Sequence, residues 1–306
     1  MTKIFIDGSS GTTGLRINDR LSGRNDIELL SIPDELRKDI KTKTEIINSA
    51  DIVFLCLPDA AAIESVGLVK NNNTVIIDTS TAHRTSEGWT YGFPELIGDD
   101  IIANSKRIAN PGCHASGFVA LIKPLIDGGV INPDTLLSCF SLTGYSGGGK
   151  NMIAEYERAD INPLYLAPRQ YGLTQNHKHL KEMTAITGLN NSPAFSPIVA
   201  NFYSGMEVTV NLFKQDILGS VADIKSIYRN TYKNGLVKFC DNSEERGFLS
   251  ANAFSGRDDM EITVHGNDNR ITLVARFDNL GKGASGAAIQ NMNIVMGVDQ
   301  CKGLNI

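Results

Sequence analysis

The sequence predicts an α/β fold with two domains, one on a parallel sheet and the other an α+β domain on a mixed sheet. The first third of the 306-residue chain alternates short β-branched runs with helix-like segments, which is typical of a parallel α/β sheet. Beyond residue 113 the strand candidates show more polar–apolar alternation, which indicates a mixed or antiparallel sheet.

The first domain is expected to begin with a strand over Lys3–Asp7, followed by a glycine turn and a helix over Leu15–Leu21. Further strands are predicted at Ile27–Ser31, Asp51–Leu57 and Thr74–Asp78. The second of these is almost continuously apolar, as expected for a strand that is buried on both faces.

The second domain contains five strand candidates: Leu136–Leu142, Glu207–Phe213, Leu236–Phe239, Glu261–His265 and Arg270–Phe277. A final helix over Ser285–Val298 is expected to pack back onto the first domain. The predicted boundaries are therefore residues 1–112 for a nucleotide domain, completed by 285–306, and residues 113–284 for a catalytic and oligomerisation domain.

Composition excludes several classes of protein. The chain is 42% hydrophobic and 21% charged, with a net charge of −5 and no basic block, so nucleic acid is not an expected partner. No apolar run reaches membrane-spanning length, and the start of the chain enters a strand without the apolar region of a signal peptide. We therefore expect a cytoplasmic protein with no membrane contact.

The cysteines are odd in number and scattered, and none forms a Cys-x-x-Cys pair. This pattern fits reduced thiols and argues against a disulfide framework or structural zinc, so no metal site is expected. The five positions are Cys56, Cys113, Cys139, Cys240 and Cys301.

The glycine turn has the spacing Gly8-x-x-Gly11-x-x-Gly14 between a strand and a helix, which predicts a Rossmann-type dinucleotide site. The helix N-terminus would face the pyrophosphate. A tight structural turn would give the same glycine pattern. The predicted cofactor-binding residues here are Gly8, Ser10, Gly11, Thr12, Thr13 and Gly14.

The end of the second strand favours NADP over NAD. Ser31 stands where NAD sites usually carry an acidic residue that grips the ribose 2′-hydroxyl, and Arg37 and Lys38 follow shortly. The alternative is that these two basic residues form a solvated helix face.

Cys113 follows Asn110-Pro111-Gly112 and precedes a helix-like run over 114–122. A helix N-terminus favours thiolate, the form that attacks carbonyl carbon. The helix dipole stabilises a thiolate by roughly 0.3–1 kcal/mol, and a shift of one pKa unit requires about 1.4 kcal/mol. The dipole alone therefore lowers the pKa of a cysteine thiol only from about 8.5 to about 8. A reactive Cys113 therefore needs a second activator; otherwise it is a small buried hydrophobe.

Four stretches together resemble the short-chain form of the N-acetyl-γ-glutamyl-phosphate reductases. They are Gly8–Gly14, Asn110–Cys113, His177-Lys178-His179 with Glu182, and Asp278–Gly286. The resemblance implies NADPH-dependent reduction of N-acetyl-glutamyl phosphate to the semialdehyde through a cysteine thioester, in arginine biosynthesis. The chain departs from the longer enzymes at His114, where they usually have an aromatic residue, and at Lys178, where they have arginine.

The paired histidines are the candidate second activator. In an extended segment, His177 and His179 would point the same way. One would pair with Cys113 as acid/base, and the other would bind substrate, with Glu182 orienting the pair. The family pattern favours His177 as the acid/base; the alternative is two ordinary surface histidines. His114 is expected to pack or cap, and His83 and His265 have no constellation around them.

Other residues are candidates for anion binding. The loop Gly144–Lys150 offers backbone N–H groups and the cation of Lys150. Arg84 and Arg107 flank predicted strand ends and are candidate carboxylate or phosphate ligands. The resemblance places Asn279 against the nicotinamide carboxamide, a role that a donor–acceptor amide can fill.

Two other functions stay open from the sequence. One is a semialdehyde dehydrogenase that acts on aspartyl phosphate or an aminoadipyl analogue. The other is a non-catalytic NADP-binding sensor, against which the Cys113, His177 and Glu182 set argues. In either case we expect a homo-oligomer, a dimer or a tetramer.

Overall fold

The computed structural model describes residues 1–37 and 39–306. Its internal contacts divide the chain into two compact units. Unit 1 comprises Met1–Pro111 and Ala284–Leu304, and unit 2 comprises Gly112–Gly283 and Asn305–Ile306. Lys38, which the sequence places near the cofactor, lies outside the described residues.

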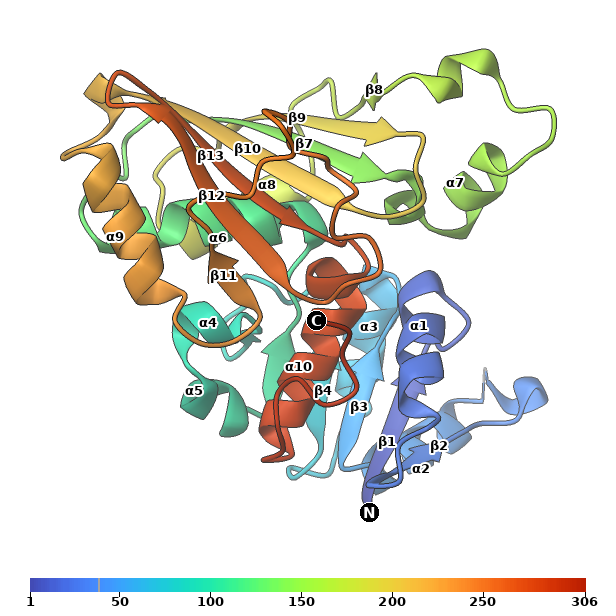
Figure 1. The fold of residues 1–306 in the computed structure, drawn as a ribbon. Coiled ribbons are helices and arrows are strands. Elements are labelled where there is room, and N and C mark those ends of the chain that lie inside the picture. Colours follow the sequence, from blue (N-terminus) through green and yellow to red (C-terminus); the bar gives the residue numbers. More distant parts are fainter. Residues whose placement is uncertain (38) are drawn as a thin grey trace. The chain divides into compact units, whose positions relative to one another are not determined.

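Unit 1 is built on a parallel sheet in the order β2-β1-β3-β4-β6-β5, which confirms the predicted parallel architecture (Figure 1). The strands are β1 (Thr2–Asp7), β2 (Ile27–Leu30), β3 (Ile52–Leu55), β4 (Val75–Asp78), β5 (Thr90–Tyr91) and β6 (Arg107–Ala109).

Helices cover both faces of this sheet. One apolar cluster joins strand residues such as Ile4 and Phe54 to Ile17 of α1 and Ile289 of α10, while the other joins Val53 to helix residues of α2 and α3. All of β3 is buried, which explains its continuous apolar sequence. The helices of unit 1 are α1 (Thr12–Leu21), α2 (Ile40–Ser49), α3 (Asp59–Gly67), α4 (Pro94–Ile97), α5 (Asp99–Ala103) and α10 (Gly286–Val295).

Unit 2 is built on a mixed sheet in the order β11-β12-β13-β10-β7-β9-β8, as the sequence predicts. The β7–β9 and β11–β12 pairs are parallel, and the other pairs are antiparallel. The strands are β7 (Ser138–Gly144), β8 (Arg169–Gln170), β9 (Ala194–Ala200), β10 (Met206–Phe213), β11 (Val237–Phe239), β12 (Met260–Asn267) and β13 (Arg270–Phe277).

Helix α6 is the central helix of unit 2 and packs against β10 and β13, with α8 and α9 as its helical neighbours (Figure 1). Tyr228 of α9 and Tyr232, which follows the end of α9, each donate a hydrogen bond of 2.6 Å to a backbone carbonyl of α6. The helices here are α6 (Cys113–Asp127), α7 (Gly149–Tyr156), α8 (His179–Thr187) and α9 (Val221–Thr231).

The sequence-based strands begin and end within two residues of the observed ones, but several elements were not predicted. Helix α2 contains many β-branched residues, which have low helix propensity, and its one clear signal is the Asp39 side chain that caps the Thr42 N–H. Helix α9 carries a capping box between Ser220 and Asp223 that could have revealed it. Pro197 argues against a strand at β9, yet it lies inside one.

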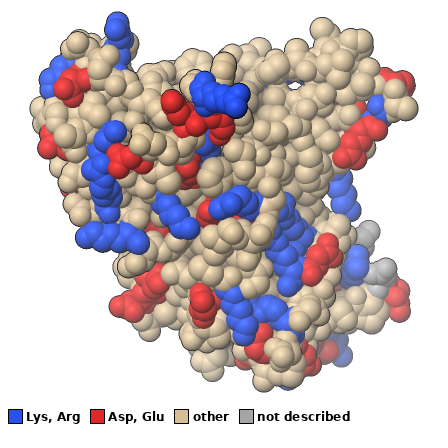
Figure 2. All heavy atoms as spheres, viewed as in Figure 1, with Lys and Arg blue, Asp and Glu red and all other residues tan. Residues whose placement is uncertain are grey.

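The surface carries charges of both signs. Figure 2 shows lysine and arginine side chains interspersed with aspartate and glutamate on the face in view, as the modest net charge of −5 suggests. Within the described ranges, no helix is both long and apolar enough to cross a membrane.

The close packing of α6 on the sheet generates a stability prediction. A Cβ atom added at Gly117 would lie 2.5 Å from Val208 Cγ2, so Gly117→Ala overpacks this contact and is expected to lower the free energy of unfolding by about 1–3 kcal/mol. Gly67→Ala at the end of α3 is the matched control, because no atom lies within 4 Å of its added Cβ. Urea denaturation measures both; equal midpoints would contradict the packing argument.

Candidate functional site

The turn after β1 depends on a glycine. Gly8 has φ of +87°, and an added Cβ would lie 2.3 Å from the carbonyl oxygen of Cys56. The Gly8 carbonyl accepts a hydrogen bond of 3.0 Å from the Gly11 N–H, and α1 begins at Thr12 immediately afterwards. The chain thus turns sharply at the carboxyl end of β1 and presents the first backbone N–H groups of α1, as a pyrophosphate site requires.

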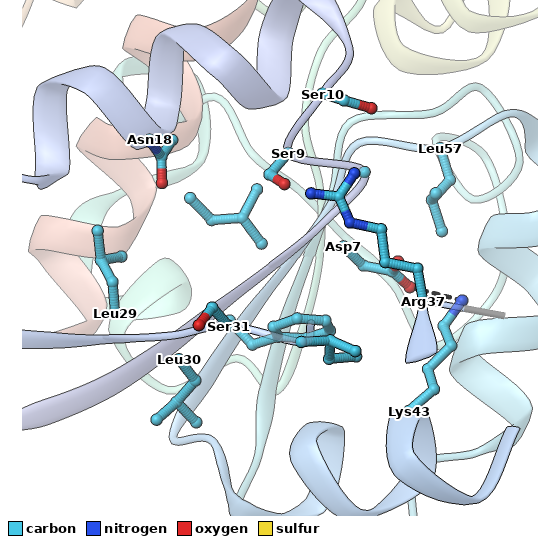
Figure 3. A pocket seen from close by; sticks show the side chains of 14 residues that line it. Asp7, Ser9, Ser10, Asn18, Leu29, Leu30, Ser31, Arg37, Lys43 and Leu57 are labelled. Atoms are coloured by element: carbon cyan, nitrogen blue, oxygen red, sulfur yellow. Dashed lines mark ion pairs between the residues drawn. The ribbon is translucent and has the colours of Figure 1, made fainter. Parts of the chain in front are cut away.

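A cavity of about 300 Å³ lies beside this turn, at the carboxyl ends of β1 and β2. Its polar lining includes Ser9, Ser10, Ser31, Arg37 and Lys43 (Figure 3). Its apolar lining comes from Phe5, Ile6, Leu29, Leu30, Ile32 and Leu57. Apolar walls with a few hydroxyl groups, two cations and the Asp7 carboxylate fit the adenosine part of a dinucleotide.

Lys43 is a member of this lining that the sequence reasoning missed. It projects from α2, and its Nζ lies 2.8 Å from Asp7 Oδ2 (Figure 3). Asp7 Oδ2 also accepts a hydrogen bond of 2.9 Å from Ser65 Oγ. Both Lys43 and Asp7 are largely buried. The residue was missed because helix α2 itself was not predicted, so nothing indicated that Lys43 faces the cavity.

In unit 2, Cys113 is the first residue of α6, directly after the N-cap Gly112. Gly283 approaches it closely, because a Cβ added at Gly283 would lie 3.1 Å from Cys113 Cβ. The glycine-rich segment before α10 therefore lies against the thiol-bearing residue. The structure thus gives a steric reason for the glycine at position 283, within the Asp278–Gly286 stretch.

Glu182 is attached to the same helix start. Its Oε1 accepts a hydrogen bond of 2.8 Å from the Gly112 N–H, and only 2% of the residue is exposed. This bond joins α8 to the beginning of α6 across 70 residues of sequence. Glu182 therefore holds the helix that begins with His179 beside Cys113.

The two predicted histidines lie together, but not on an extended segment. Lys178 between them is helical, with φ of −55° and ψ of −27°, and the imidazole centroids of His177 and His179 are 4.8 Å apart. The expectation of an extended segment was wrong because α8 begins here. The His179 N–H donates to His177 Nδ1 at 3.2 Å, so the neutral His177 ring carries its proton on Nε2.

Burial differs between these histidines. His179 is buried and His177 is half-buried. Burial, with a smaller contribution from the charge of Lys178, lowers the pKa of His177 below its ordinary value. The His177 imidazole is therefore neutral at physiological pH and able to accept a proton.

His114 does more than pack or cap. Its Nδ1 lies 2.6 Å from Ser141 Oγ and its Nε2 lies 2.7 Å from the Tyr171 hydroxyl oxygen. The ring is buried, with its centroid 5.7 Å from that of His177. Because His114 follows Cys113 in α6, this contact brings His177 to the start of that helix.

The loop that carries Tyr171 and His177 is attached to β9. Gln175 has an unusual φ of +55°, and its side chain makes both a donated bond to the Phe195 carbonyl (2.7 Å) and an accepted bond from the Phe195 N–H (2.8 Å). These two bonds fix the loop position and offset the strain at Gln175.

Asn279 is buried in unit 2 with its orientation fixed. Its Oδ1 accepts from the Gly205 N–H at 2.9 Å, and its Nδ2 donates to Ser146 Oγ at 3.0 Å. An amide Nδ2 carries two hydrogens, so this arrangement is compatible with a further contact to a carboxamide.

The three predicted cations are in different settings. Lys150 is exposed on the first turn of α7. Arg84 donates to the carbonyls of Asn110 (3.0 Å) and Thr79 (3.1 Å), which places it at the carboxyl end of β4 and β6. Arg107 instead lies at the amino end of β6 and donates to the Thr74 and Lys106 carbonyls. Arg107 therefore lies at the edge of the sheet opposite to Asn110, away from the motif that leads to Cys113.

His83 also has a constellation, contrary to expectation. Its Nδ1 lies 2.6 Å from Oδ2 of the fully buried Asp78, and its ring stacks on Trp89 with centroids 4.0 Å apart. Asp78 also accepts bonds from the backbone and hydroxyl of Ser80. These contacts fix the turn after β4 that carries Arg84.

Within residues 1–37 and 39–306, no cluster of three His, Cys, Asp or Glu side chains could hold a metal ion.

Comparison with known proteins matches both units. The semialdehyde dehydrogenase NAD-binding domain matches residues 9–104, and the semialdehyde dehydrogenase dimerisation domain matches residues 113–279. Among curated relatives, N-acetyl-γ-glutamyl-phosphate reductase 2 of Nostoc sp. is 42% identical over 99% of both chains. The N-acetyl-γ-glutamyl-phosphate reductase of Mesorhizobium japonicum is 41% identical over 97% of this chain and 99% of its own.

Solved structures share the fold at much lower identity. Aspartate semialdehyde dehydrogenase II of Vibrio cholerae, in complex with ASA, superposes with a TM-score of 0.72 at 14% identity, covering 97% of this chain and 98% of its own. The aspartate semialdehyde dehydrogenase of Francisella tularensis gives a TM-score of 0.71 at 16% identity, covering 97% and 100%.

Proposed function

The chain belongs to the N-acetyl-γ-glutamyl-phosphate reductase family, and we propose that it converts N-acetyl-glutamyl 5-phosphate and NADPH to N-acetyl-glutamate 5-semialdehyde, phosphate and NADP⁺ in arginine biosynthesis. One observation carries the proposal. A cysteine at a helix start, Cys113, shares unit 2 with His177 and His179, and buried Glu182 connects the two elements.

Cys113 is the proposed nucleophile. Its sulfur attacks the acyl carbon, a carbon–sulfur bond forms, and the carbon–oxygen bond to phosphate breaks. NADPH, when bound, would supply a hydride, which brings the two electrons and the hydrogen of the new carbon–hydrogen bond at the acyl carbon. The carbon–sulfur bond then breaks and the aldehyde leaves. The first N–H groups of α6 are suited to stabilise the oxyanion on the acyl carbon.

His177 is the proposed acid/base. It accepts the thiol proton as Cys113 becomes thiolate and returns a proton to the oxygen that leaves. Its lowered pKa supports this role, because the ring stays neutral and can take up a proton. Since the neutral ring carries its proton on Nε2, the thiol proton would be accepted on Nδ1, which would release the hydrogen bond from the His179 N–H. His179 and Glu182 are proposed to position substrate, with Glu182 acting through the Gly112 N–H.

The residues of unit 1 fit NADP. The Gly8–Gly14 turn, with Ser10, Thr12 and Thr13, would hold the pyrophosphate at the start of α1. Ser31, Arg37 and Lys43 would hold the 2′-phosphate, since the cavity has two cations and Ser31 stands in place of an acidic residue. Asn279 remains the proposed contact of the nicotinamide carboxamide.

Lys150 and Arg84 remain proposed ligands for the anionic groups of the substrate. Arg107 is left out of the proposed site, because it lies at the amino end of β6.

The match to a dimerisation domain supports a homo-oligomer, dimer or tetramer, built through unit 2. The five free cysteines support a cytoplasmic location.

The reaction is tested in reverse. With NADP⁺ and phosphate, N-acetylglutamate semialdehyde should be oxidised far faster than aspartate semialdehyde, and a preference for the latter would contradict the substrate assignment. Cys113→Ser should lose turnover but bind NADPH as the wild type does, because the thiol lies outside the glycine turn. Turnover above about a tenth of wild type would exclude Cys113 as nucleophile.

Cofactor preference tests the basic cavity. We expect a higher kcat/KM with NADPH than with NADH. Lys43→Gln should weaken NADPH binding about tenfold, the equivalent of about 1.4 kcal/mol, and leave NADH binding nearly unchanged. Fluorescence titration of both cofactors measures this. Lys41→Gln, on the exposed side of the same helix, is the control; an equal effect there would indicate a general loss of positive charge.

Alkylation of Cys113 by iodoacetamide separates the two histidines. His177→Asn should slow alkylation markedly near neutral pH, because the helix dipole alone shifts a thiol by only about half a pKa unit. His179→Asn should mainly raise KM for the acyl phosphate. The opposite pattern would reverse the assignment, and no effect in either variant would exclude both as activators.

A further inference from the structure

Three side chains from distant parts of unit 2 form a continuous hydrogen-bonded row. Ser141 of β7 contacts His114 Nδ1, and His114 Nε2 contacts the hydroxyl group of Tyr171 in the loop before α8. Ser141 and His114 are buried, and Tyr171 is half-buried. The middle of the row lies at the start of α6, since His114 directly follows Cys113.

The middle member of the row is neutral. Burial, with smaller contributions from His177 and Lys178, lowers the pKa of His114 to about 3. A neutral imidazole has one N–H donor and one acceptor nitrogen. Because each ring nitrogen of His114 has its own hydroxyl partner, the two hydrogen bonds must run in the same direction along the row.

The end of the row keeps its proton. Burial, together with the negative charge of Cys113, raises the pKa of Tyr171 well above its ordinary value. The hydroxyl group is therefore a hydrogen-bond donor and not an acid at working pH. The phenol oxygen lies 2.7 Å from Nε2 of His114, the residue next to Cys113, which places the hydroxyl group close to the start of α6.

The direction of the row follows from this charge. If Ser141 donates to Nδ1 and the Nε2–H donates to Tyr171, the Tyr171 O–H remains available to a third group. In the opposite direction the Tyr171 O–H donates to His114 Nε2, and only a lone pair of the Tyr171 oxygen is left to face the sulfur. A thiolate favours the first arrangement, because it attracts an O–H and repels a lone pair.

We propose that Ser141 and His114 are positioning residues that direct the Tyr171 O–H toward Cys113, so that Tyr171 donates a hydrogen bond to the thiolate and then to the oxyanion formed on the acyl carbon. No proton is transferred in this role, which complements that of His177. The oxyanion part rests on the proposed function, whereas the thiolate part rests on the geometry of unit 2 alone.

The pH profile of Cys113 alkylation by iodoacetamide tests the thiolate part without any substrate. Tyr171→Phe should move the midpoint of the profile upward by about one pH unit, the size expected for a hydrogen bond to a charged group. His114→Phe should move it in the same direction. The double variant should show no further shift, since both changes remove the same donor.

Two further variants test whether the shift of the midpoint is a purely structural effect. Tyr228→Phe removes the hydroxyl of another buried tyrosine, which donates to the Leu121 carbonyl at 2.6 Å; it should lower stability and leave the midpoint in place. His114→Gln keeps a donor and an acceptor and should restore part of the wild-type profile. If His114→Phe does not fold, Ser141→Ala removes the donor to Nδ1 and should give a smaller upward shift.

The outcomes separate this inference from the proposed function. In turnover, Tyr171→Phe should lower kcat about 100-fold with little change in KM, as for loss of one oxyanion donor. An unchanged midpoint of the alkylation profile in Tyr171→Phe, or additive shifts in the double variant, would contradict the proposed role of the row. A shifted midpoint in a protein that does not oxidise N-acetylglutamate semialdehyde would leave the row intact and reject the proposed substrate.

Discussion

The hydrogen bond from the Gly112 N–H to Glu182 is the interaction on which the arrangement of unit 2 depends. Gly112 is the N-cap of α6 and Glu182 lies in the first turn of α8, so this one bond sets the position of two helix starts. Both carry the side chains of interest at those starts, Cys113 on α6 and His179 on α8. The Glu182 carboxyl group also pairs with the N–H of the N-cap residue of α6, a group that has no partner within the helix.

Close approach of backbone imposes a second constraint on the same helix start. Gly283 lies so near Cys113 that any side chain would meet the cysteine Cβ. The glycine-rich segment therefore restricts the space around the thiol-bearing residue. A restricted position suits the proposed role of Cys113 as a nucleophile, because attack on a carbonyl carbon requires a defined geometry.

The sequence was sufficient to predict features that are local, but it was not sufficient to predict features that depend on contacts across the fold. The glycine turn, the helix start at Cys113 and the two paired histidines are each contained within a few residues. By contrast, the partners of His114 lie 27 and 57 residues away, and no spacing rule connects them. Lys43 was not predicted to face the cavity because the helix that carries it was not predicted. The sequence also does not indicate at which end of β6 Arg107 lies. The His83–Asp78 pair, only five residues apart, was within reach of the sequence alone.

The proposed activation of Cys113 illustrates why contacts across the fold matter. A helix N-terminus alone shifts a thiol by about half a pKa unit, so the remainder must come from groups that the helix does not carry. The loop before α8 brings two such groups to the start of α6, a neutral imidazole at His177 and a phenol at Tyr171. They act differently, because an imidazole with a lowered pKa can take the thiol proton, whereas a phenol with a raised pKa keeps its own. The Gln175 side chain attaches that loop to β9 by two hydrogen bonds to the Phe195 backbone, so the mixed sheet contributes to the position of both proposed activators.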